Sequence, residues 1–573
     1  MPARIVALVL LAVLAGLGLW SDRPPAPVPA SAPATEFSAE RALPIVGDLA
    51  REPHPLGSPA AGQVRDDVVA RLRALGLTPQ VHTAVVRGGT VANVVATLPG
   101  TAPTGTVVLA AHQDSVPGGP GAADDVASVA AILETVRALR AGPPLRDDVE
   151  VLLTDGEEAG LLGAQAWVRD DLPRDRPTVV LNHEARGVGG PSLIFQTSPG
   201  DAGLIRAVAD AVPHPRGDSS LVAVYRLLPN DTDLSVVLAA GRPGVNSAFI
   251  EGPSAYHTAG DTPAALSAAS VQNQGSTMLA LARELGDADL RPLDPVASGL
   301  PPQPDAVYFR FLGALITYPQ AWVVPIALAA AAALVGAVAL GRRREVLAVG
   351  GALVAAATAM GAVVVALGLG AALGALLAGL LGDRDVGPYS GALLPSEAAD
   401  IALAVLVVLG WAVLVRRRHG PLAAGAGAAA LLTVLGLATA VVVPGASFLL
   451  ALPALGLGLG LGAAVLLHGR PTAAVAALAV GTVPTAALLL PFAPQVFLVD
   501  GVAHGFAVAA FALALSACSW PIGGAGSPTE RRSHARRQSI MNFGTSPSVP
   551  DSMINCLDDH LAEGPGPPDV SRT

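Results

Sequence analysis

The chain is poor in several residue types that support common kinds of site. It contains no lysine, so its basic residues are all arginine or histidine, and its two cysteines, Cys518 and Cys556, both lie near the C-terminus. The N-terminal half therefore cannot form an internal disulfide, bind a metal through thiolates or use a cysteine nucleophile. Together with the abundance of alanine, glycine and proline, the absence of lysine is typical of proteins from GC-rich bacterial genomes.

Charge is also scarce, and it is unevenly distributed. Charged residues make up 14% of the chain and hydrophobic residues 52%, but the charges gather in the first half, while nearly all long apolar runs follow Pro319. This division predicts a soluble domain joined to a membrane domain. The net charge is −10 and the soluble half has no basic stripe, so we expect no nucleic-acid partner.

The N-terminus carries a short apolar run that Arg4 precedes. Such a segment, residues 1–20, is either a signal peptide or a signal anchor. No small-x-small cleavage site follows Trp20 directly, which favours an anchor. In both cases Arg4 stays inside and the following residues are exported. Residues 21–36 are rich in proline and alanine, which predicts an extended linker.

Residues 37–290 alternate strand-like and helix-like segments. This alternation predicts an α/β domain in which helices cover both faces of a sheet. A second Pro-rich linker is expected at residues 291–320. The expected helices are 64–75, 126–139 and 161–168, and the expected strands are 91–97, 106–111, 148–154 and 178–181.

Residues 321–520 are expected to form an all-α transmembrane bundle of about seven helices, because apolar runs of roughly 20 residues match the thickness of a bilayer. Basic clusters follow the first, third, fifth and seventh runs, as the positive-inside rule requires. This pattern puts the soluble domain on the extracytoplasmic side of a bacterial plasma membrane. It puts a disordered polar tail, residues 521–573, in the cytoplasm. The expected spans are 321–341, 346–368, 399–415, 421–443, 446–467, 472–494 and 501–520.

Polar residues that can carry chemistry occur where predicted strands end or helices begin, and in open α/β sheets ligands bind at the carboxyl ends of strands. His112 follows a buried strand, and Asp114 stands two residues further on. A metal-bound histidine usually has its second ring nitrogen held by a carboxylate or carbonyl, which suits this pair. Asp124 opens a helix, and its simpler interpretation is an N-cap.

Two adjacent carboxylates, Glu157 and Glu158, follow another apolar strand. They fit either a solvated turn or a pair in which one carboxylate binds a metal and the other takes a proton from water. Glu184 follows the next strand, and His257 comes later, ahead of Asp261, a candidate cap of the next helix. Taken together, nitrogen and oxygen ligands without sulfur, with a bridging carboxylate, describe a two-metal hydrolytic site.

The order of these segments resembles peptidase family M28, the zinc aminopeptidases. The family pattern is His-x-Asp, Gly-(x)-Ala-Asp-Asp, Glu-Glu, Asp or Glu, and a late His. This chain has HQDS, GAADDVAS, DGEEAGLLG, NHEARG and YHTAGDT in that order, and with EPHPLGSP and PNDTDLSVV it is particularly similar to the endoplasmic-reticulum metallopeptidase and vacuolar membrane protease branch. The match spans residues 52–262. It implies a mixed twisted β-sheet flanked by helices, of the zinc exopeptidase type.

Carried over to this chain, the resemblance implies two zinc ions. His112 and Glu184 would hold one ion, Glu158 and His257 would hold the other, and Asp124 would bridge both. Many soluble members of the family have Asp where this chain has Glu184, which we interpret as a mark of the membrane subtype.

The resemblance also implies an activity, the hydrolysis of peptide bonds with release of N-terminal residues from peptides outside the membrane. Glu157 would be the general base that takes a proton from the bridging water, and Asp114 would orient the first histidine. Tyr256, Tyr225 and Arg186 are candidates for stabilising the oxyanion.

Other functions fit parts of the same pattern. Glutaminyl cyclases resemble the family but keep one metal and rework the first-His segment, whereas His112 and Glu184 both persist here. A catalytically inactive or narrowly specific ectodomain of a membrane scaffold or transporter is another hypothesis. The spans hold almost no ionisable residues that would mark an ion path, apart from Asp400 and His504 near helix ends. No Gly-x-Ser-x-Gly elbow occurs in the exported half, which excludes a serine hydrolase of that kind.

Overall fold

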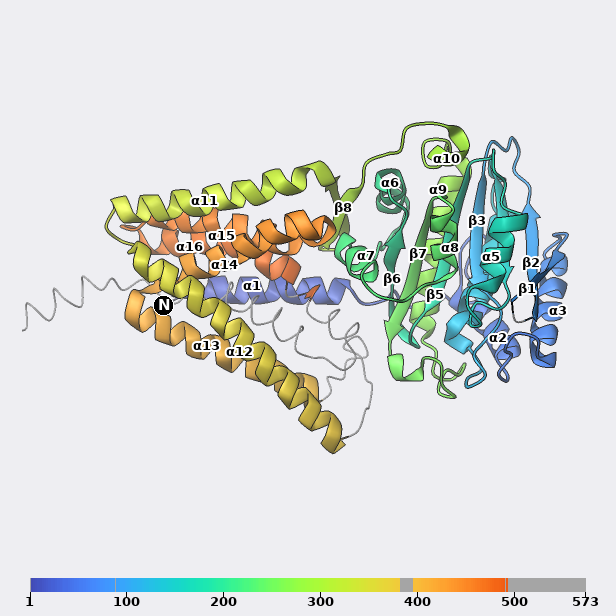
Figure 1. Ribbon diagram of the computed structural model, residues 1–573, viewed down its shortest axis with the longest axis horizontal. Helices are drawn as coiled ribbons and strands as arrows, with labels where there is room; N and C mark the ends of the chain where they lie inside the picture. The colour runs from blue at the N-terminus through green and yellow to red at the C-terminus, as the bar shows by residue number, and fades with distance from the viewer. Residues whose placement is uncertain (1, 88, 382–394, 490, 493–573) are drawn as a thin grey trace, which may run out of the picture. The chain divides into compact units, whose positions relative to one another are not determined.

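The computed structural model describes residues 2–87, 89–381, 395–489 and 491–492. Its largest sheet has seven strands: β1 (Gln80–Val86), β2 (Gly89–Leu98), β3 (Thr106–His112), β4 (Asp148–Thr154), β5 (Thr178–Ala185), β6 (Gly189–Thr197) and β7 (Gly244–Glu251). Their order across the sheet is β1-β2-β4-β3-β5-β7-β6 (Figure 1). The four central strands run parallel, whereas β1, β2 and β6 pair antiparallel with their neighbours. The predicted α/β fold with a mixed sheet is confirmed.

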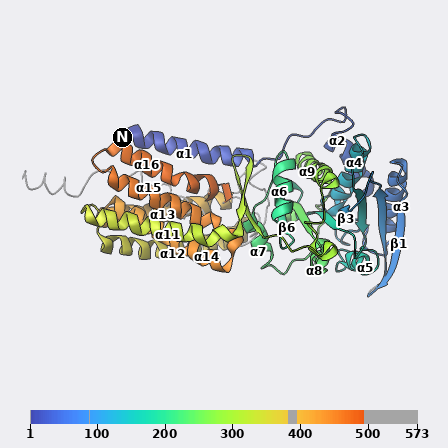
Figure 2. The same ribbon diagram turned by 90° about the horizontal axis from the view of Figure 1, so that it is seen from above.

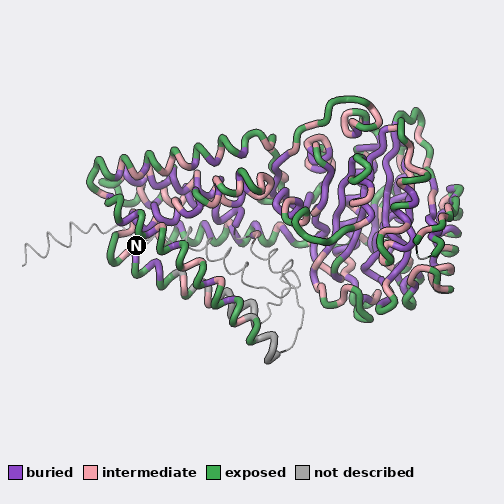
Figure 3. The backbone as a smooth tube through the Cα atoms, viewed as in Figure 1, coloured by how far each residue is buried: buried purple, intermediate pink, exposed green. Residues whose placement is uncertain are grey.

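The central strands are buried on both faces, as strand β3 illustrates. All seven of its residues are buried, so the strand reads as a continuous apolar run before His112. Val107 and Leu109 point into the apolar core on one face of the sheet, and Val108 and Ala110 into a smaller core on the other face. Figure 3 shows this burial along the central strands.

Helices cover both faces, as the alternation of segments predicts. The larger core includes residues of α2 (Ala39–Leu49), α3 (Pro59–Ala74), α4 (Ala127–Arg140), α6 (Ala202–Ala211) and α9 (Ala268–Asp287). The smaller core includes residues of α5 (Leu162–Asp170) and α8 (Asp233–Ala239), with the fully buried Trp167 at its centre. A further short helix, α7 (Ser219–Tyr225), contacts β6.

The bounds of β4 agree with the expected strand, and the expected strand 178–181 extends four residues further to Ala185. That extension brings polar residues, Glu184 among them, into the sheet itself. The sequence pattern missed β1, β6 and β7. β1 is an edge strand with little burial, which leaves it without an apolar run.

The expected linker at residues 291–320 is wrong in its second part. Residues 306–319 form an antiparallel hairpin of β8 (Ala306–Phe311) and β9 (Ala314–Pro319). The two faces of strand β8 pack into different apolar clusters. Val307 and Phe309 contact the membrane half, and Tyr308 on the other face contacts α6 and α7. Burial on both faces makes this short segment a strand although its flanks are rich in proline.

The second half of the chain is helical. Among the described residues its long helices are α11 (Val323–Arg343), α12 (Val349–Leu381), α13 (Pro395–His419), α14 (Pro421–Val442), α15 (Phe448–Leu466) and α16 (Pro471–Pro484), and the N-terminal α1 (Pro2–Ser21) is a further apolar helix. Among the described residues, six helical segments are long and apolar enough to cross a membrane, and α1 is one of them. The expected span 399–415 falls in α13, several of whose side chains lie outside the described residues, and only described residues enter the count of six. The expected span 501–520 and the tail 521–573 lie outside the described residues.

The N-terminal helix α1 lies beside α16 (Figure 2). Ala7 and Leu11 of α1 share a buried apolar cluster with Val475 and Ala486. The helix is therefore part of the same helical assembly as the later apolar segments.

Candidate active site

His112 is the last residue of β3 and is 1% exposed. Its Nδ1 lies 2.9 Å from the backbone carbonyl oxygen of Asp114. A carbonyl oxygen can only accept, so Nδ1 carries the proton and the lone pair of Nε2 is left to bind a cation. The Asp114 carboxylate lies further from Nδ1, at 3.7 Å, so the backbone carbonyl of that residue is what holds the ring.

The Asp124 carboxylate lies between two histidines. Its Oδ1 is 3.1 Å from Nε2 of His112, and its Oδ2 is 3.2 Å from Nε2 of His257. His257 has a backbone φ of 60°, in the left-handed region that non-glycine residues rarely adopt, and its ring stacks on Tyr256 at a centroid distance of 3.7 Å. The ring plane and the unusual backbone direct its Nε2 into the site.

The loop that carries Asp124 is held by a residue far away in the sequence. Both oxygens of Asp261 accept backbone N–H bonds, from Ala123 at 2.7 Å and from Asp124 at 3.1 Å. Gly121 has φ 64°, and a Cβ there would lie 2.6 Å from the Asp124 carbonyl oxygen, so the turn needs glycine.

Two simpler interpretations are therefore wrong. Asp124 does not act as an N-cap, because α4 begins after Val126 without a side-chain cap bond and Asp124 itself has φ −112°. Asp261 does not cap the next helix either, since Ser267 caps α9. Both carboxylates have other partners that place them at the site.

Glu157 and Glu158 follow β4 in a loop that Asp114 fixes. The Asp114 carboxylate accepts the backbone N–H of Glu157 at 3.0 Å and that of Glu158 at 3.3 Å. The Oε2 of Glu158 lies 3.1 Å from Nε2 of His257. Glu157 and Glu158 therefore lie on one loop that the Asp114 carboxylate holds in place. The Glu158 carboxylate is close to His257.

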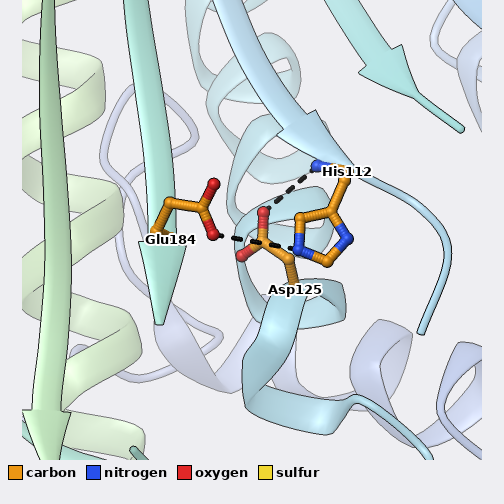
Figure 4. A group of neighbouring side chains, drawn as sticks. All are labelled: His112, Asp125 and Glu184. Carbon is orange, nitrogen blue, oxygen red and sulfur yellow. Dashed lines mark hydrogen bonds and ion pairs between the residues drawn. The ribbon is translucent and has the colours of Figure 1, made fainter. Parts of the chain in front are cut away.

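Glu184 approaches His112 from the neighbouring strand β5, with 3.8 Å between its Oε2 and Nε2 of His112. Figure 4 shows these two residues with Asp125, which the sequence analysis did not single out. One oxygen of Asp125 accepts the backbone N–H of His112 at 3.2 Å. The side chains of His112, Asp125 and Glu184 are close enough to hold one cation, and so are those of His112, Asp124 and Glu158.

The site is rich in buried acidic groups. Burial raises the pKa of Glu157 to about 9, and the neighbouring carboxylates of Asp233, Asp124 and Glu158 add to the effect, which the charge of His112 opposes. Burial also raises the pKa of Glu184 well above its usual range. A positive charge placed among these groups would lower both pKa values. The arrangement therefore suits a bound cation.

Two observations test whether a metal fits. Among the described residues, the buried Oε1 of Glu158 and Oδ1 of Asp125 have no hydrogen-bond partner. Zinc bonds of about 2.0–2.1 Å in a tetrahedron put ligand atoms roughly 3.3 Å apart. The donor atoms at the two histidines lie 3.1–3.8 Å apart, and none is sulfur. The residues therefore fit zinc.

A cavity of about 130 Å³ opens beside these residues. Asp124, Glu157, Glu184 and Asp231 are among the residues that line it, and most of the other lining side chains are apolar or aromatic, Phe195 among them. The three residues proposed to contact the oxyanion, Tyr225, Tyr256 and Arg186, all line it as well. Burial raises the pKa of both tyrosines, so each keeps its hydroxyl proton and can donate it.

Comparisons with known proteins show which proteins the chain is similar to. Residues 93–282 match peptidase family M28. The chain is 34% identical over 219 residues to endoplasmic reticulum metallopeptidase 1 of Rattus norvegicus, a match that covers 37% of this chain and 24% of that protein. It is 35% identical over 181 residues to the vacuolar membrane protease of Lachancea thermotolerans, covering 31% and 18%. The chain thus spans about a quarter of the length of the first of these relatives.

Two solved structures are also similar to the soluble half. One is the glutaminyl cyclase of Porphyromonas gingivalis, with 21% identity, a TM-score of 0.37 and coverage of 44% of this chain and 99% of that one. The other is a zinc aminopeptidase from Bacillus subtilis, with 15% identity, a TM-score of 0.37 and coverage of 45% and 98%.

The suspected resemblance to the membrane branch is confirmed by the family match and by the two membrane-protein relatives. The apolar helices make this chain an integral membrane protein. Residues 93–282 of the chain are thus the part that resembles peptidase family M28.

Proposed function

We propose that this domain hydrolyses peptide bonds with water activated by two zinc ions, and that it releases N-terminal residues from peptides. The observation that carries the proposal is the position of Asp124. Its two oxygens lie 3.1 and 3.2 Å from Nε2 of His112 and Nε2 of His257. A carboxylate that places one oxygen near each of two metal-binding histidines can bridge two cations.

The ligand sets follow from the remaining contacts. His112 and Glu184 would complete one zinc site, and His257 and Glu158 the other, each together with Asp124. Asp125 accepts the backbone N–H of His112 and so would help to hold this ligand of the first zinc site in position. Retention of both sets favours a two-metal peptidase over a one-metal cyclase.

Bound zinc would lower the pKa of a water molecule and polarise the scissile carbonyl. Glu157 would accept a proton from that water at its carboxylate and later donate it to the nitrogen of the leaving amine. The protonated hydroxyls of Tyr225 and Tyr256 would donate hydrogen bonds to the oxygen of the tetrahedral intermediate. Their place in the lining of the cavity supports this role.

The cavity supports an exopeptidase that acts on free N-termini. The carboxylates in its lining would attract an α-ammonium group, and its apolar side chains would receive the first side chain of the peptide. Basic residues follow α11, α13 and α15. By the positive-inside rule this favours an extracytoplasmic position for the domain, on a bacterial plasma membrane.

Metal analysis of the purified full-length protein tests the two-zinc proposal. We expect two equivalents of zinc per chain in the wild type and about one in His257→Ala, with peptidase activity abolished by a chelator and restored by zinc. The variant His82→Ala changes a half-buried histidine of the edge strand β1, and as the matched control it should keep two equivalents. One equivalent in the wild type would instead support a glutaminyl-cyclase-like acyl transfer, and none would support an inactive ectodomain.

A further inference from the structure

The short helix α7 contacts both the cavity of the soluble domain and the membrane half of the chain. Its side chains Leu221, Val224 and Tyr225 line the cavity beside the proposed metal site. These positions are three and four residues apart, so they share one face of the helix. The ring of Tyr225 packs edge-on against Phe195 of β6, with 4.8 Å between centroids. Helix α7 is therefore one wall of the proposed substrate pocket.

Another face of α7 contacts the membrane half. The hydroxyl of Ser219 donates to the carbonyl oxygen of Gly445 at 2.6 Å. Gly445 lies in the single turn Pro444–Ala446, which joins α14 to α15. Ser219 also accepts the backbone N–H of Tyr308 at 3.2 Å, so the start of α7 is held from two sides.

The contact is too close for any side chain at position 445. A Cβ on Gly445 would lie 2.7 Å from the carbonyl oxygen of Ser219 and 3.4 Å from the Cβ of Ala223. The first of these neighbours is backbone, which cannot rotate away. Any larger residue would have to move α7 or the turn.

The order of the helices agrees with this contact. The soluble domain leads through the β8–β9 hairpin into α11, and basic residues end α11 and α13 and follow α15. The turn Pro444–Ala446 stands at the opposite end of α14 from these basic groups and has none of its own. The positive-inside rule thus puts the turn on the same side of the membrane as the soluble domain.

We propose that the membrane half completes the substrate site, because the turn Pro444–Ala446 positions the α7 wall and so determines which N-terminal side chains the pocket accepts. Gly445 and Ser219 are positioning residues that touch neither the proposed metals nor the cavity. The inference rests on the proposed peptidase function. It assigns the apolar helices a role in substrate selection in addition to anchoring.

The test compares two Gly→Ala variants of the full-length protein in detergent. Gly445→Ala inserts a methyl group against α7, whereas Gly469→Ala changes a turn glycine with no atom within 4 Å of the added Cβ. Substrates are peptides with N-terminal Leu or Phe and matched peptides with N-terminal Ala. For Gly445→Ala we expect KM for the Leu and Phe peptides to rise about tenfold, with kcat, the Ala peptides and zinc content nearly unchanged. Gly469→Ala should behave as the wild type.

A second variant keeps the test informative if Gly445→Ala fails to fold. Ser219→Ala removes the hydrogen bond to Gly445 without adding bulk, and should shift the Leu-to-Ala preference in the same direction by a smaller factor. Preferences equal to the wild type in both Gly445→Ala and Ser219→Ala would overturn the inference. So would an equal loss of activity on every peptide together with lost zinc, which would indicate a general structural role.

A readout independent of activity separates the inference from the proposed function. Amide hydrogen exchange across residues 219–228 should be faster in Gly445→Ala than in Gly469→Ala. A wild type that cleaves no peptide would contradict the proposed function, and the exchange data would still test the contact. Equal exchange in the two variants would overturn the inference even if the peptidase is active.

Discussion

The carboxylate of Asp114 accepts a hydrogen bond from the backbone N–H of Glu157, with 3.0 Å between the two atoms. This bond joins the end of β3, which carries His112, to the loop after β4. The same carboxylate also accepts the N–H of Glu158 at 3.3 Å. Asp114 therefore ties the proposed general base to the first proposed metal ligand through the backbone.

This relationship predicts the effect of removing the carboxylate. Asp114→Ala would leave two partly buried N–H groups without their acceptor and release the loop of Glu157. Because residues that orient metal ligands typically contribute 10–100-fold, we expect kcat/KM to fall by about that factor. Asp114→Asn keeps one acceptor oxygen and should lie between the wild type and Asp114→Ala. Equal kinetics for all three proteins would contradict the role of this carboxylate.

Glu157→Gln tests the proton transfer separately from the metals. The amide cannot accept the proton of the attacking water, so we expect kcat to fall by about 10²–10⁴-fold while the zinc content stays at the wild-type value. Its neighbour supplies the comparison: Glu158→Gln replaces a carboxylate 3.1 Å from Nε2 of His257 and should lose zinc. A Glu157→Gln enzyme with wild-type kcat would exclude Glu157 as the general base.

Asp22, directly after α1, forms buried ion pairs with Arg216 and Arg310. Its side chain is 9% exposed, and those of Arg216 and Arg310 are 4% and 12% exposed. Asp22→Ala would leave both guanidinium groups buried without this carboxylate, which typically costs about 3–5 kcal/mol. We expect a clearly lower midpoint of thermal unfolding in detergent.

The matched control for Asp22 is an exposed aspartate that also pairs with two arginines. Asp48 contacts Arg51 and Arg71, and 47% of its side chain is exposed. Exposed pairs contribute little, so Asp48→Ala should leave the unfolding midpoint unchanged. Identical midpoints for the two variants would argue against a stabilising role of the buried pairs.

Asp218 gives a prediction for pH. It caps α7 by accepting the N–H groups of Ser220 and Leu221, and burial raises its pKa to about 6. In the unfolded chain an aspartate has a pKa of about 3.9, so the folded state holds this proton more tightly. The stability that this proton provides is fully present below pH ~4 and is lost as the pH rises through about 6.

The variant Asp218→Asn isolates this effect, because asparagine caps helices about as well as aspartate and carries no charge. The negative charge of the nearby Asp22 raises the pKa of the Asp218 carboxyl further. We expect the free energy of unfolding of the variant, minus that of the wild type, to increase between pH 4 and pH 7 by on the order of 2 kcal/mol. Denaturant titrations at several pH values measure it. A difference that stays constant over this range would contradict the prediction.

Part of the candidate site could be predicted from the sequence, because strand periodicity locates the residues that follow buried strands. Five residues were singled out from separate segments, and each lies 3.1–3.8 Å from at least one other member of the group: His112, Asp124, Glu158, Glu184 and His257. Parallel strands bring their carboxyl ends to one edge of the sheet, which explains the grouping of His112, Glu158 and Glu184, whereas Asp124 and His257 were assigned to the same site only through the family resemblance.

The remaining parts depend on contacts between distant segments, which no local pattern reveals. Asp261 binds the backbone of Asp124 across 137 positions of sequence, and its local context suggested only a helix cap. Asp125 contributes through the backbone N–H of His112. The docking of α7 on Gly445 and the hairpin at residues 306–319 depend on two halves of the chain coming together.

The most direct test of the central claim uses the full-length protein and pairs of short peptides that differ only in a free or acetylated N-terminus. Each pair is assayed with and without a chelator, beside Glu157→Ala. We predict chelator-sensitive release of the first residue from the free peptides alone, and no release by the variant. Cleavage of both forms would contradict the aminopeptidase assignment, and no cleavage of either form by the zinc-loaded protein would contradict the proposed peptidase activity itself.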